Sequence, residues 1–380
     1  MSKTVLLTLG RMPKSLDLAR GFHALGWRVV VAEPFAWHLC RASRTVSKSL
    51  RVRAPARDPD GYLDDLRKVI ERERIDLVVP VSEETLHVAG LTEGLAAGVR
   101  LYAPPRAALL ELHDKLMFAR KMRALALPVP ETHPADSDAG KTLAADRAYV
   151  LKPANSCAGL GVSMHAAGTP LPERGARRDL VVQERLDGRL LSSFSMLRAG
   201  RVLVTSVYRG VVMSGTVAVC FERLAEHAGI ADFAASFASK TGYSGFVSFD
   251  FVEDDAGRVQ AIECNPRVTS GIHFLEAEDV ARAIAEPDAD GPVRFRPQTL
   301  MQQFYPCLIE WQAAMFNGRE RGMKWRAMRE ARDVTWDPRD PLVFPTMTFT
   351  SYPILVPAVF KGKSMGETAT EDILWSGAGT

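Results

Sequence analysis

The most informative feature of this sequence is a pair of runs, Phe246-Val-Ser-Phe-Asp250-Phe-Val252 and Val259-Gln-Ala-Ile-Glu263-Cys-Asn265-Pro-Arg267. Both runs alternate with the two-residue period of a β-strand. The residues between them, Asp254-Asp255-Ala256-Gly257, are typical of a hairpin turn. The sequence therefore predicts an antiparallel hairpin whose two faces can be compared residue by residue.

The pairing across this hairpin places two acidic residues near each other. We expect Glu253 to pair with Arg258 across the loop. Asp250 then lies opposite Ala261, and Glu263 lies diagonal to Asp250 on the same face. That separation is within side-chain reach, so the hairpin predicts a pair of neighbouring carboxylates.

Asn265 lies one step beyond Glu263 on the same face, and it adds an amide oxygen to the pair. Oxygen ligands of this kind suit a hard cation, and Arg267 would face an anion that the cation holds. The alternative is an exposed hairpin with its acidic side in water. Apart from its acidic residues, however, this face is predicted to be apolar, with Phe246, Val252, Val259 and Ala261. An apolar face is expected to be buried, and buried carboxylate pairs require a cation or a proton. We therefore predict a magnesium–phosphate site at Asp250, Glu263 and Asn265.

Length and composition limit the class of protein. The 380 residues suffice for two or three domains, and the net charge of +3 with no dense basic block argues against nucleic acid as a partner. The five cysteines show no C-x-x-C spacing, which argues against a disulfide framework or a zinc site. The N-terminus enters a strand without a signal-peptide pattern, so we expect a cytoplasmic protein.

Residues 344–360 are the most apolar stretch. Pro345, Pro353 and Pro357 interrupt it, and it is too short for a membrane span. We interpret it as a buried, proline-interrupted lobe, with a peripheral lipid-facing role as the alternative.

The first hundred residues alternate strands with helices, which predicts a small doubly wound parallel α/β domain. The expected strands are residues 4–9, 27–33 and 76–81, and the expected helices are residues 14–25 and 62–74. Its first turn, at Gly10, lacks the G-x-G-x-x-G fingerprint and disfavours a dinucleotide. Glu83 and Glu84 follow the third strand, where open sheets bind ligands. One of them could anchor an amine, or both could simply occupy the first turn of the next helix.

The middle of the chain predicts a second α/β region. Helices are expected over residues 107–125 and near 230–242, and strands over 148–153, 180–186, 201–208 and 211–218. Residues 156–162 form a glycine-containing loop whose N–H groups can approach a polyphosphate. Lys115 and Lys152 could neutralise the same phosphates, although either lysine taken alone suits a solvated surface.

The order of these features resembles the ATP-grasp superfamily, including carboxylate–amine ligases and the large subunit of carbamoyl-phosphate synthase. The resemblance runs from about Lys115 to Gly271 and extends to the preceding domain. It implies an ATP-grasp fold with the nucleotide between two α+β lobes. The implied domains are 1–105, 106–290, with a mobile nucleotide lobe at 115–185, and a C-terminal extension at 291–380. The implied nucleotide-binding residues are Lys115, Lys152, Ser156, Gly159, Gly161, Val162, Gln183, Glu184 and Leu186.

The chain departs from the family pattern at two places. The usual Gly-x-Glu after the hinge is replaced by a run that begins with Asp187, so Asp187 either provides the ribose contact or that contact is missing. Ala158 replaces a customary glycine in the loop. Cys157, beside it, could be a nucleophile, but nothing nearby in the sequence activates it, which favours a neutral packing residue.

The resemblance implies an enzyme that forms an amide or peptide bond through an acyl phosphate and releases ADP and phosphate. It implies ATP with Mg²⁺, or Mn²⁺ in its place, and small carboxylate and amine substrates. Asn265 and Arg267 are the implied catalytic residues, with Arg267 holding the carboxylate or acyl phosphate. Arg209 and Arg223 could bind a substrate carboxylate or could be surface or structural arginines. The alternatives are a small-molecule kinase and a non-catalytic ATP-binding protein, and the C-terminal lobe could form a homodimer surface or a lid.

Overall fold

The computed structural model describes residues 2–156, 159–172, 179–288, 291–315, 320–363 and 365–375. The chain forms two compact units, each built from segments that are not contiguous in sequence. The first unit comprises Met1–Pro105, Tyr208–Ala225 and Arg267–Leu374, and the second comprises Arg106–Val207, Glu226–Pro266 and Trp375–Thr380. These units are defined by contacts within the fold and do not test the predicted division of the sequence into three consecutive domains, which stays a prediction.

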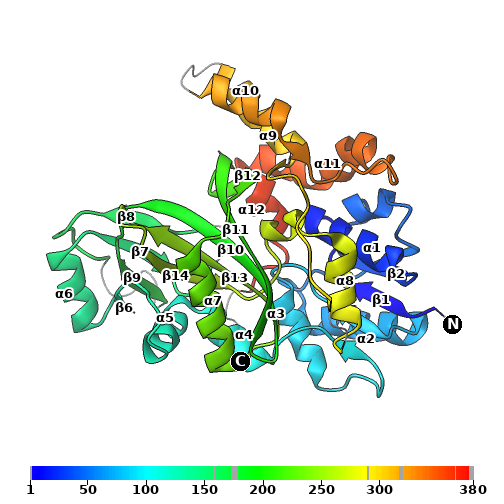
Figure 1. Ribbon diagram of the computed structural model, residues 1–380, viewed down its shortest axis with the longest axis horizontal. Coiled ribbons are helices and arrows are strands. Elements are labelled where there is room, and N and C mark those ends of the chain that lie inside the picture. Colours follow the sequence, from blue (N-terminus) through cyan, green and yellow to red (C-terminus); the bar gives the residue numbers. More distant parts are fainter. Residues whose placement is uncertain are drawn as a thin grey trace. The chain divides into compact units, whose positions relative to one another are not determined.

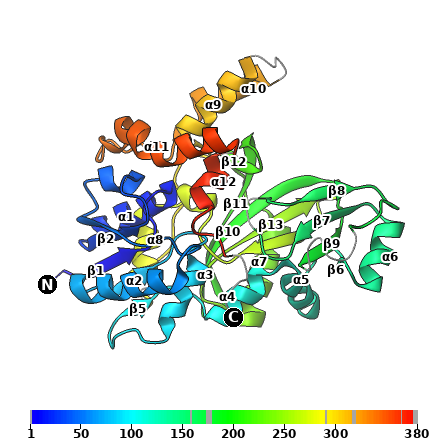
Figure 2. The ribbon, with the colours of Figure 1, turned by 180° about the vertical axis from the view of Figure 1, so that it is seen from behind.

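The first unit contains a parallel sheet with helices on both faces, which confirms the predicted doubly wound architecture (Figures 1 and 2). Buried Leu6, Val30 and Val78 pack against α2 on one face, and α1 lies with α8 on the other. A Cβ atom at Gly21 of α1 would lie 2.1 Å from the carbonyl oxygen of Ala277, so this close helix contact requires glycine. The strands, in the order β3-β2-β1-β4-β5, are β1 (Thr4–Leu7), β2 (Arg28–Glu33), β3 (Lys48–Arg51), β4 (Leu77–Val79) and β5 (Arg100–Leu101). The helices are α1 (Pro13–Ala24), η1 (Leu39–Ala42), α2 (Pro59–Glu73), α3 (Thr85–Val88), η2 (Ala89–Thr92), η3 (Ser270–Phe274) and α8 (Ala277–Ala285).

The C-terminal part of the first unit is mostly helical. Helices α9 (Phe304–Met315) and α10 (Arg321–Glu330) pack together through Trp311 and Trp325, whose ring centroids are 5.0 Å apart. Figure 1 shows this pair extending away from α11. The remaining elements are β12 (Val217–Arg223), β15 (Leu300–Gln302), β16 (Arg332–Asp333), α11 (Val343–Lys361) and α12 (Met365–Thr370).

The interpretation of residues 344–360 as a buried, interrupted lobe is wrong. The segment is the continuous helix α11, with Pro353 and Pro357 inside it. Only one stripe of the helix is buried, because Phe349, Tyr352 and Phe360 are 72%, 63% and 86% exposed. Among the residues that the structure describes, no helix is long and apolar enough to cross a membrane.

The second unit contains two antiparallel sheet regions. Helix α6 packs on a four-stranded sheet of order β6-β9-β7-β8. The other region pairs β13 with β10 and β14, and Phe249 of β13 packs against Phe118 of α5 and Phe233 and Phe237 of α7. The elements are α4 (Arg106–His113), α5 (Lys115–Ala124), β6 (Thr132–Pro134), α6 (Asp138–Asp146), β7 (Tyr149–Pro153), β8 (Ser163–His165), β9 (Leu180–Glu184), β10 (Arg189–Arg198), β11 (Arg201–Ser214, of which residues 208–214 belong to the first unit), α7 (Ala228–Thr241), β13 (Gly245–Glu253) and β14 (Val259–Asn265).

Two sequence-based expectations about elements are wrong, and one strand was missed. The helix expected over residues 107–125 is broken at Asp114, which has extended backbone angles and accepts hydrogen bonds from the N–H groups of Leu116 and Met117. Residues 201–214 form one strand, β11, which joins the strands expected over 201–208 and 211–218, because the chain turns at Gly215, with φ of 60°, and not near Gly210. The last residues of the expected second strand, 217 and 218, begin β12. Strand β10 was not expected at all.

Candidate functional site

The acidic hairpin forms as predicted, but its register is shifted by one residue from the turn onward, because Glu253 lies opposite Val259 and not opposite the expected Arg258. Asp250 lies opposite Glu263, whereas the expected partner Ala261 lies opposite Phe251. Two steps along β14 therefore match one step along β13, and Ile262 is the extra residue of a β-bulge. The expectation that Glu263 lies diagonal to Asp250 is wrong, because the shift at the turn and the bulge together place the two carboxylates directly opposite each other.

Two neighbouring side chains donate hydrogen bonds to these carboxylates. The Asn265 amide donates from Nδ2 to Asp250 Oδ2 at 3.1 Å and to Glu263 Oε1 at 3.5 Å. Ser192 of β10, which lies opposite Asp250 in the sheet, donates from Oγ to Asp250 Oδ1 at 2.5 Å. The structure thus brings Asp250, Glu263 and Asn265 together, as the sequence predicts.

Lys115 enters this cluster because Asp114 caps helix α5. The cap makes Lys115 the first residue of the helix, and the N–H group of Lys115 donates to the carbonyl oxygen of Ala154 at 3.0 Å. Lys115 Nζ donates to the carbonyl oxygen of Ser156 at 2.6 Å and lies 3.9 Å from Glu263 Oε2. One lysine therefore connects the start of the glycine loop with the acidic pair.

Lys152 is a buried lysine on β7. Its Nζ donates to Gln183 Oε1 at 2.8 Å and to the carbonyl oxygen of Ile262 in the bulge at 3.1 Å. Burial lowers the pKa of Lys152 to about 8, Glu263 and Asp250 act against that effect, and Lys115 adds to it. The residue is thus a cation held where solvent does not stabilise its charge.

The lysines and the acids stabilise each other's charges. Burial alone would raise the pKa of Glu263, but Lys115 and Lys152 outweigh burial and lower it below its ordinary value. Glu263 is therefore ionised at neutral pH. The second unit consequently holds two carboxylates side by side with two ammonium groups near them.

The donor set fits a magnesium ion when the amide is included. No group of three or more His, Cys, Asp or Glu side chains that could hold a metal is found among the described residues. The predicted set has only two such residues, Asp250 and Glu263, and its third member is the Asn265 amide. Carboxylate and amide oxygens with a net negative charge are what Mg²⁺ prefers. The residue types present therefore suit the cation that the sequence predicts, and the Asn265 amide, which donates from Nδ2 to both carboxylates here, would turn over to present its oxygen to the ion.

The glycine loop has the backbone conformation that its sequence suggests. Gly159 and Gly161 have φ values of 68° and 74°, which favour glycine, and the N–H group of Val162 donates to the carbonyl oxygen of Gly159 at 3.2 Å. Cys157 and Ala158 lie outside the described residues. The described ends of the loop are consistent with a phosphate-binding turn, and this role stays a prediction.

The residues predicted at the adenine end lie at and after the end of β9. Gln183 is buried, accepts from Lys152, and donates from Nε2 to Thr132 Oγ1 at 3.1 Å. Glu184 forms an ion pair with Arg147 at 3.0 Å. The side chains of Leu186 and Asp187 are half-buried and exposed, respectively. Gln183 thus positions Lys152, and the adenine and ribose contacts stay predictions.

In the first unit, two predicted residues form a pair. Arg267 Nη2 lies 2.5 Å from Glu83 Oε1, so the predicted catalytic arginine faces one of the predicted amine anchors. Glu84 accepts hydrogen bonds from the N–H groups of Val81 at 2.7 Å and Ser82 at 2.9 Å, and from Thr8 Oγ1 at 3.0 Å. These bonds favour the alternative that Glu84 stabilises the turn after β4.

Arg209 and Arg223 make structural contacts in the first unit. Arg209 lies opposite Glu222 in the sheet, and their side chains form an ion pair at 2.7 Å. The Arg223 guanidinium lies over the ring of Phe295 at 4.6 Å. These contacts favour the interpretation of both residues as structural arginines, and a role in substrate binding stays a prediction.

Ser192 is a site residue that the sequence reasoning missed, because β10 was not expected. The signal was present in the turns at both ends of the strand. Asp187-Gly188 precedes Arg189–Arg198, and Ala199-Gly200 follows it. A ten-residue run between two glycine turns is typical of a long strand.

Residues 112–271 of the chain are similar to a known family of domains. The family model described as an ATP-grasp domain matches residues 112–271, which contain Lys115, Lys152, Asp250, Glu263 and Asn265. This match confirms the resemblance inferred from the sequence. No curated protein matches the sequence.

Several solved structures share the fold. Biotin carboxylase from Campylobacter jejuni, in complex with an ATP analogue, has a TM-score of 0.64 and 16% identity and covers 80% of this chain and 76% of its own. N5-carboxyaminoimidazole synthetase from Staphylococcus aureus has a TM-score of 0.63 and 12% identity and covers 84% and 87%. L-amino acid ligase from Bacillus licheniformis has a TM-score of 0.59 and 15% identity and covers 77% and 78%. At these identities the similarity establishes the fold class, as predicted.

Proposed function

We propose that this protein is an ATP-dependent carboxylate–amine ligase. It would transfer the γ-phosphoryl group of ATP to a carboxylate and form an amide or peptide bond when an amine displaces the phosphate. The observation that carries the proposal is the pairing of Asp250 with Glu263, beside Asn265 and the two lysines. The similar structures add support, since one is named an L-amino acid ligase and another is bound to an ATP analogue.

The lysines would bind the phosphate oxygens. Lys152 is fixed by Gln183 and the carbonyl oxygen of Ile262, and Lys115 is fixed by Ser156, so both ammonium groups are oriented before a nucleotide arrives. Oriented charges that need no rearrangement are the main source of electrostatic stabilisation in enzymes. The bound polyphosphate would in turn relieve the repulsion between the two buried cations.

The acidic residues would hold the metal. Asp250, Glu263 and Asn265 would hold Mg²⁺, or Mn²⁺ in its place, which would neutralise charge on the transferred phosphoryl group. Ser192 keeps Asp250 in position through its hydrogen bond. Asn265 keeps the two carboxylates at a fixed separation through its amide.

Arg267 and Glu83 would bind the two organic substrates. Arg267 carries a positive charge suited to the carboxylate or the acyl phosphate, and Glu83 carries a negative charge suited to the amine. Their ion pair at 2.5 Å holds both groups ready, and substrate charges would replace it. The substrates are thus small carboxylates and amines, in a cytoplasmic enzyme that could work as a homodimer.

Nucleotide and phosphate accounting tests the proposal. Purified full-length protein is incubated with Mg-ATP and pools of amino acids and small carboxylic acids, and ADP, AMP and free phosphate are measured. ADP with stoichiometric phosphate that depends on both a carboxylate and an amine supports the ligase. ADP without free phosphate indicates a kinase, and AMP indicates adenylation and contradicts the mechanism. A thermal shift with Mg-ATP but no turnover in any pool favours a binding protein.

A further inference from the structure

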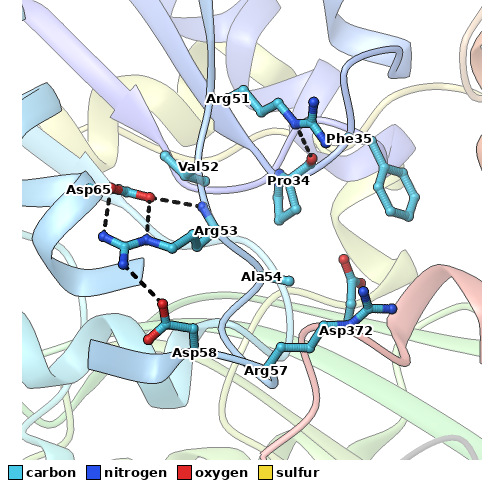
Figure 3. Close-up of a pocket in the computed structure, with 10 residues that line it drawn as sticks. All are labelled: Pro34, Phe35, Arg51, Val52, Arg53, Ala54, Arg57, Asp58, Asp65 and Asp372. Atoms are coloured by element: carbon cyan, nitrogen blue, oxygen red, sulfur yellow. Dashed lines mark hydrogen bonds and ion pairs between the residues drawn. The ribbon is translucent and has the colours of Figure 1, made fainter. Parts of the chain in front are cut away.

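The first unit contains a cavity of about 580 Å³ that the proposed ligase reaction does not use (Figure 3). It lies where β2 and β3 end and α2 begins, and the side chain of Asp372 forms part of its wall. Ligands of open parallel sheets bind at the carboxyl ends of the strands, and cavities of this size hold small molecules. None of its lining residues is among those predicted to bind ATP, metal or substrate.

The carboxylates that line the cavity are already engaged. Asp65 accepts two hydrogen bonds from the Arg53 side chain, at 2.9 and 3.0 Å, and one from the Arg53 backbone N–H at 3.0 Å (Figure 3). Asp58 accepts from Arg53 at 2.9 Å and from the N–H group of Gly61, in the first turn of helix α2, at 2.9 Å. Asp372 accepts from Arg11 at 2.6 and 3.1 Å. The acidic groups are therefore satisfied within the protein.

Two lining arginines are in the opposite situation. Arg51 and Arg57 are exposed, and neither forms an ion pair with a carboxylate in the part of the chain that the structure describes. Arg51 donates only from Nε, to the carbonyl oxygen of Pro34 at 3.3 Å, which leaves the rest of its guanidinium group facing solvent. Arginine keeps its charge at every relevant pH and matches carboxylate and phosphate oxygens in pairs. The lining thus balances three arginines with three aspartates, and Arg51 and Arg57 are the cations in it that pair with no carboxylate among the described residues.

The remaining wall is apolar and firmly held. Pro34, Phe35 and Val52 contribute hydrophobic surface. The Phe35 ring packs against the buried Arg11 guanidinium, whose central carbon lies 3.6 Å from the ring centroid. The loop between β3 and α2 is tied to the opposite wall, since the N–H group of Ala56 donates to the carbonyl oxygen of Asp372 at 3.0 Å. A ligand with both an anionic group and an apolar body would fit these surfaces.

We propose that this cavity binds a small organic anion. Arg51 and Arg57 bind its carboxylate or phosphate group, and its apolar part lies against Phe35 and Val52. The proposal does not depend on the ligase reaction, because the ligand is recognised by residues with no role in it.

The test is calorimetric titration of the full-length protein with acetate, benzoate, inorganic phosphate and phenyl phosphate. We expect saturable binding of at least one organic anion, with benzoate tighter than acetate or phenyl phosphate tighter than inorganic phosphate. Which of the two pairs binds separates a carboxylate ligand from a phosphate ligand. The double variant Arg51→Gln/Arg57→Gln should bind about tenfold or more weakly, since two charge-assisted interactions are lost.

The matched control is Arg67→Gln, which removes an exposed arginine of the same unit outside the cavity. It should bind as the unsubstituted protein does. In the absence of ligand, the double variant and the Arg67→Gln variant should both unfold at the same temperature as the unsubstituted protein, because the substituted side chains are exposed. Absence of saturable binding for all four probes, or equal affinity in the double variant and the unsubstituted protein, would overturn the proposal. Binding without any preference for the aromatic anions would overturn the role of the apolar wall.

Discussion

Two charged clusters, one in each unit, differ in how their charges are satisfied. In the first unit, Glu33 accepts hydrogen bonds from the N–H groups of Gly10 at 2.9 Å and Arg11 at 3.0 Å, and from Arg11 Nε at 2.9 Å. Arg11 also pairs with Asp372 at 2.6 Å. In the second unit, like charges lie together, because Asp250 is opposite Glu263 and Lys115 contributes to the lowered pKa of Lys152.

The difference separates a structural cluster from a functional one. The Glu33 cluster alternates opposite charges, and its hydrogen bonds join the β1–α1 turn to Asp372. The Asp250 cluster keeps two anions and two cations in adjacent pairs, and the ion pair between them is long, at 3.9 Å. Such an arrangement gains from ligands that carry the opposite charges, namely a cation for the acids and a polyphosphate for the lysines.

The largest effect is expected from Arg11→Met. Removing the arginine leaves Glu33 and Asp372 as buried anions without their partner, which costs about 3–5 kcal/mol in the free energy of unfolding. Denaturant unfolding with the slope held fixed measures this change. The control is Arg53→Gln, whose ion pairs are exposed and whose loss should change stability much less. Equal losses in the two variants would show that the Arg11 cluster is not structural.

The next effect concerns Glu263→Gln. Turnover of ATP should fall by about 10²–10³-fold, because the substitution removes one of the two carboxylates proposed to hold the cation. The free energy of unfolding should fall only modestly, since relief of the repulsion with Asp250 offsets part of the lost attraction to the lysines. Steady-state ADP release and thermal unfolding measure the two effects. Glu253→Gln, on the same hairpin but outside the cluster, should retain turnover, and a comparable loss there would contradict the assignment.

The pH dependence of nucleotide binding tests the role of Lys152 as a phosphate-binding cation. With its pKa lowered to about 8, Lys152 loses its proton above that pH, and ATP affinity should fall by roughly tenfold between pH 7 and pH 9. The folded protein then binds fewer protons than the unfolded chain between about pH 8 and the ordinary value of 10.5, so stability should rise with pH in that window. Calorimetric titration with Mg-ATP at several pH values measures the affinity.

Lys152→Arg provides the matched variant, because arginine stays charged throughout this range. Its ATP affinity should be nearly independent of pH between 7 and 9. A pH profile identical to that of the unsubstituted protein would show that another group causes the titration.

The sequence predicted those parts of the site that depend on local pattern. The period-two alternation around Asp250 and Glu263 specified the hairpin and the face that these two residues share, and both were confirmed, but Val259 and Ala261 lie on the opposite face from the one expected. The bulge at Ile262 was not predictable, because no glycine or proline marks it and its effect depends on the partner strand. The break at Asp114 had a local signal, a capping residue, that the continuous helical periodicity obscured.

Contacts between distant segments were beyond local pattern. The pairing of Arg267 with Glu83 joins residues far apart in sequence, and neither neighbourhood contains information about the other. The ion pair between Arg11 and Asp372 likewise joins residues far apart in sequence, and Asp372 forms part of the wall of the cavity in Figure 3. Periodicity reports which face of an element is buried, but it does not report what covers that face.

The smallest effect on stability and turnover is expected from Ser192→Ala. This variant tests whether the hydrogen bond from Ser192, which the sequence did not predict, keeps Asp250 in position. The variant removes the hydrogen bond of 2.5 Å to Asp250 and leaves the carboxylate with the Asn265 amide. Loss of one hydrogen bond to a charged group changes the free energy by about 1.5–3 kcal/mol at most when the acceptor stays buried, and by less when water replaces the donor. Since Asp250 is half-buried, the change in stability should be at the lower end, with a loss of turnover smaller than in Glu263→Gln. Ser195→Ala on the same strand, whose hydroxyl contacts Thr205 instead, is the control. If both variants lose turnover equally, Ser192 acts through the strand and not through Asp250.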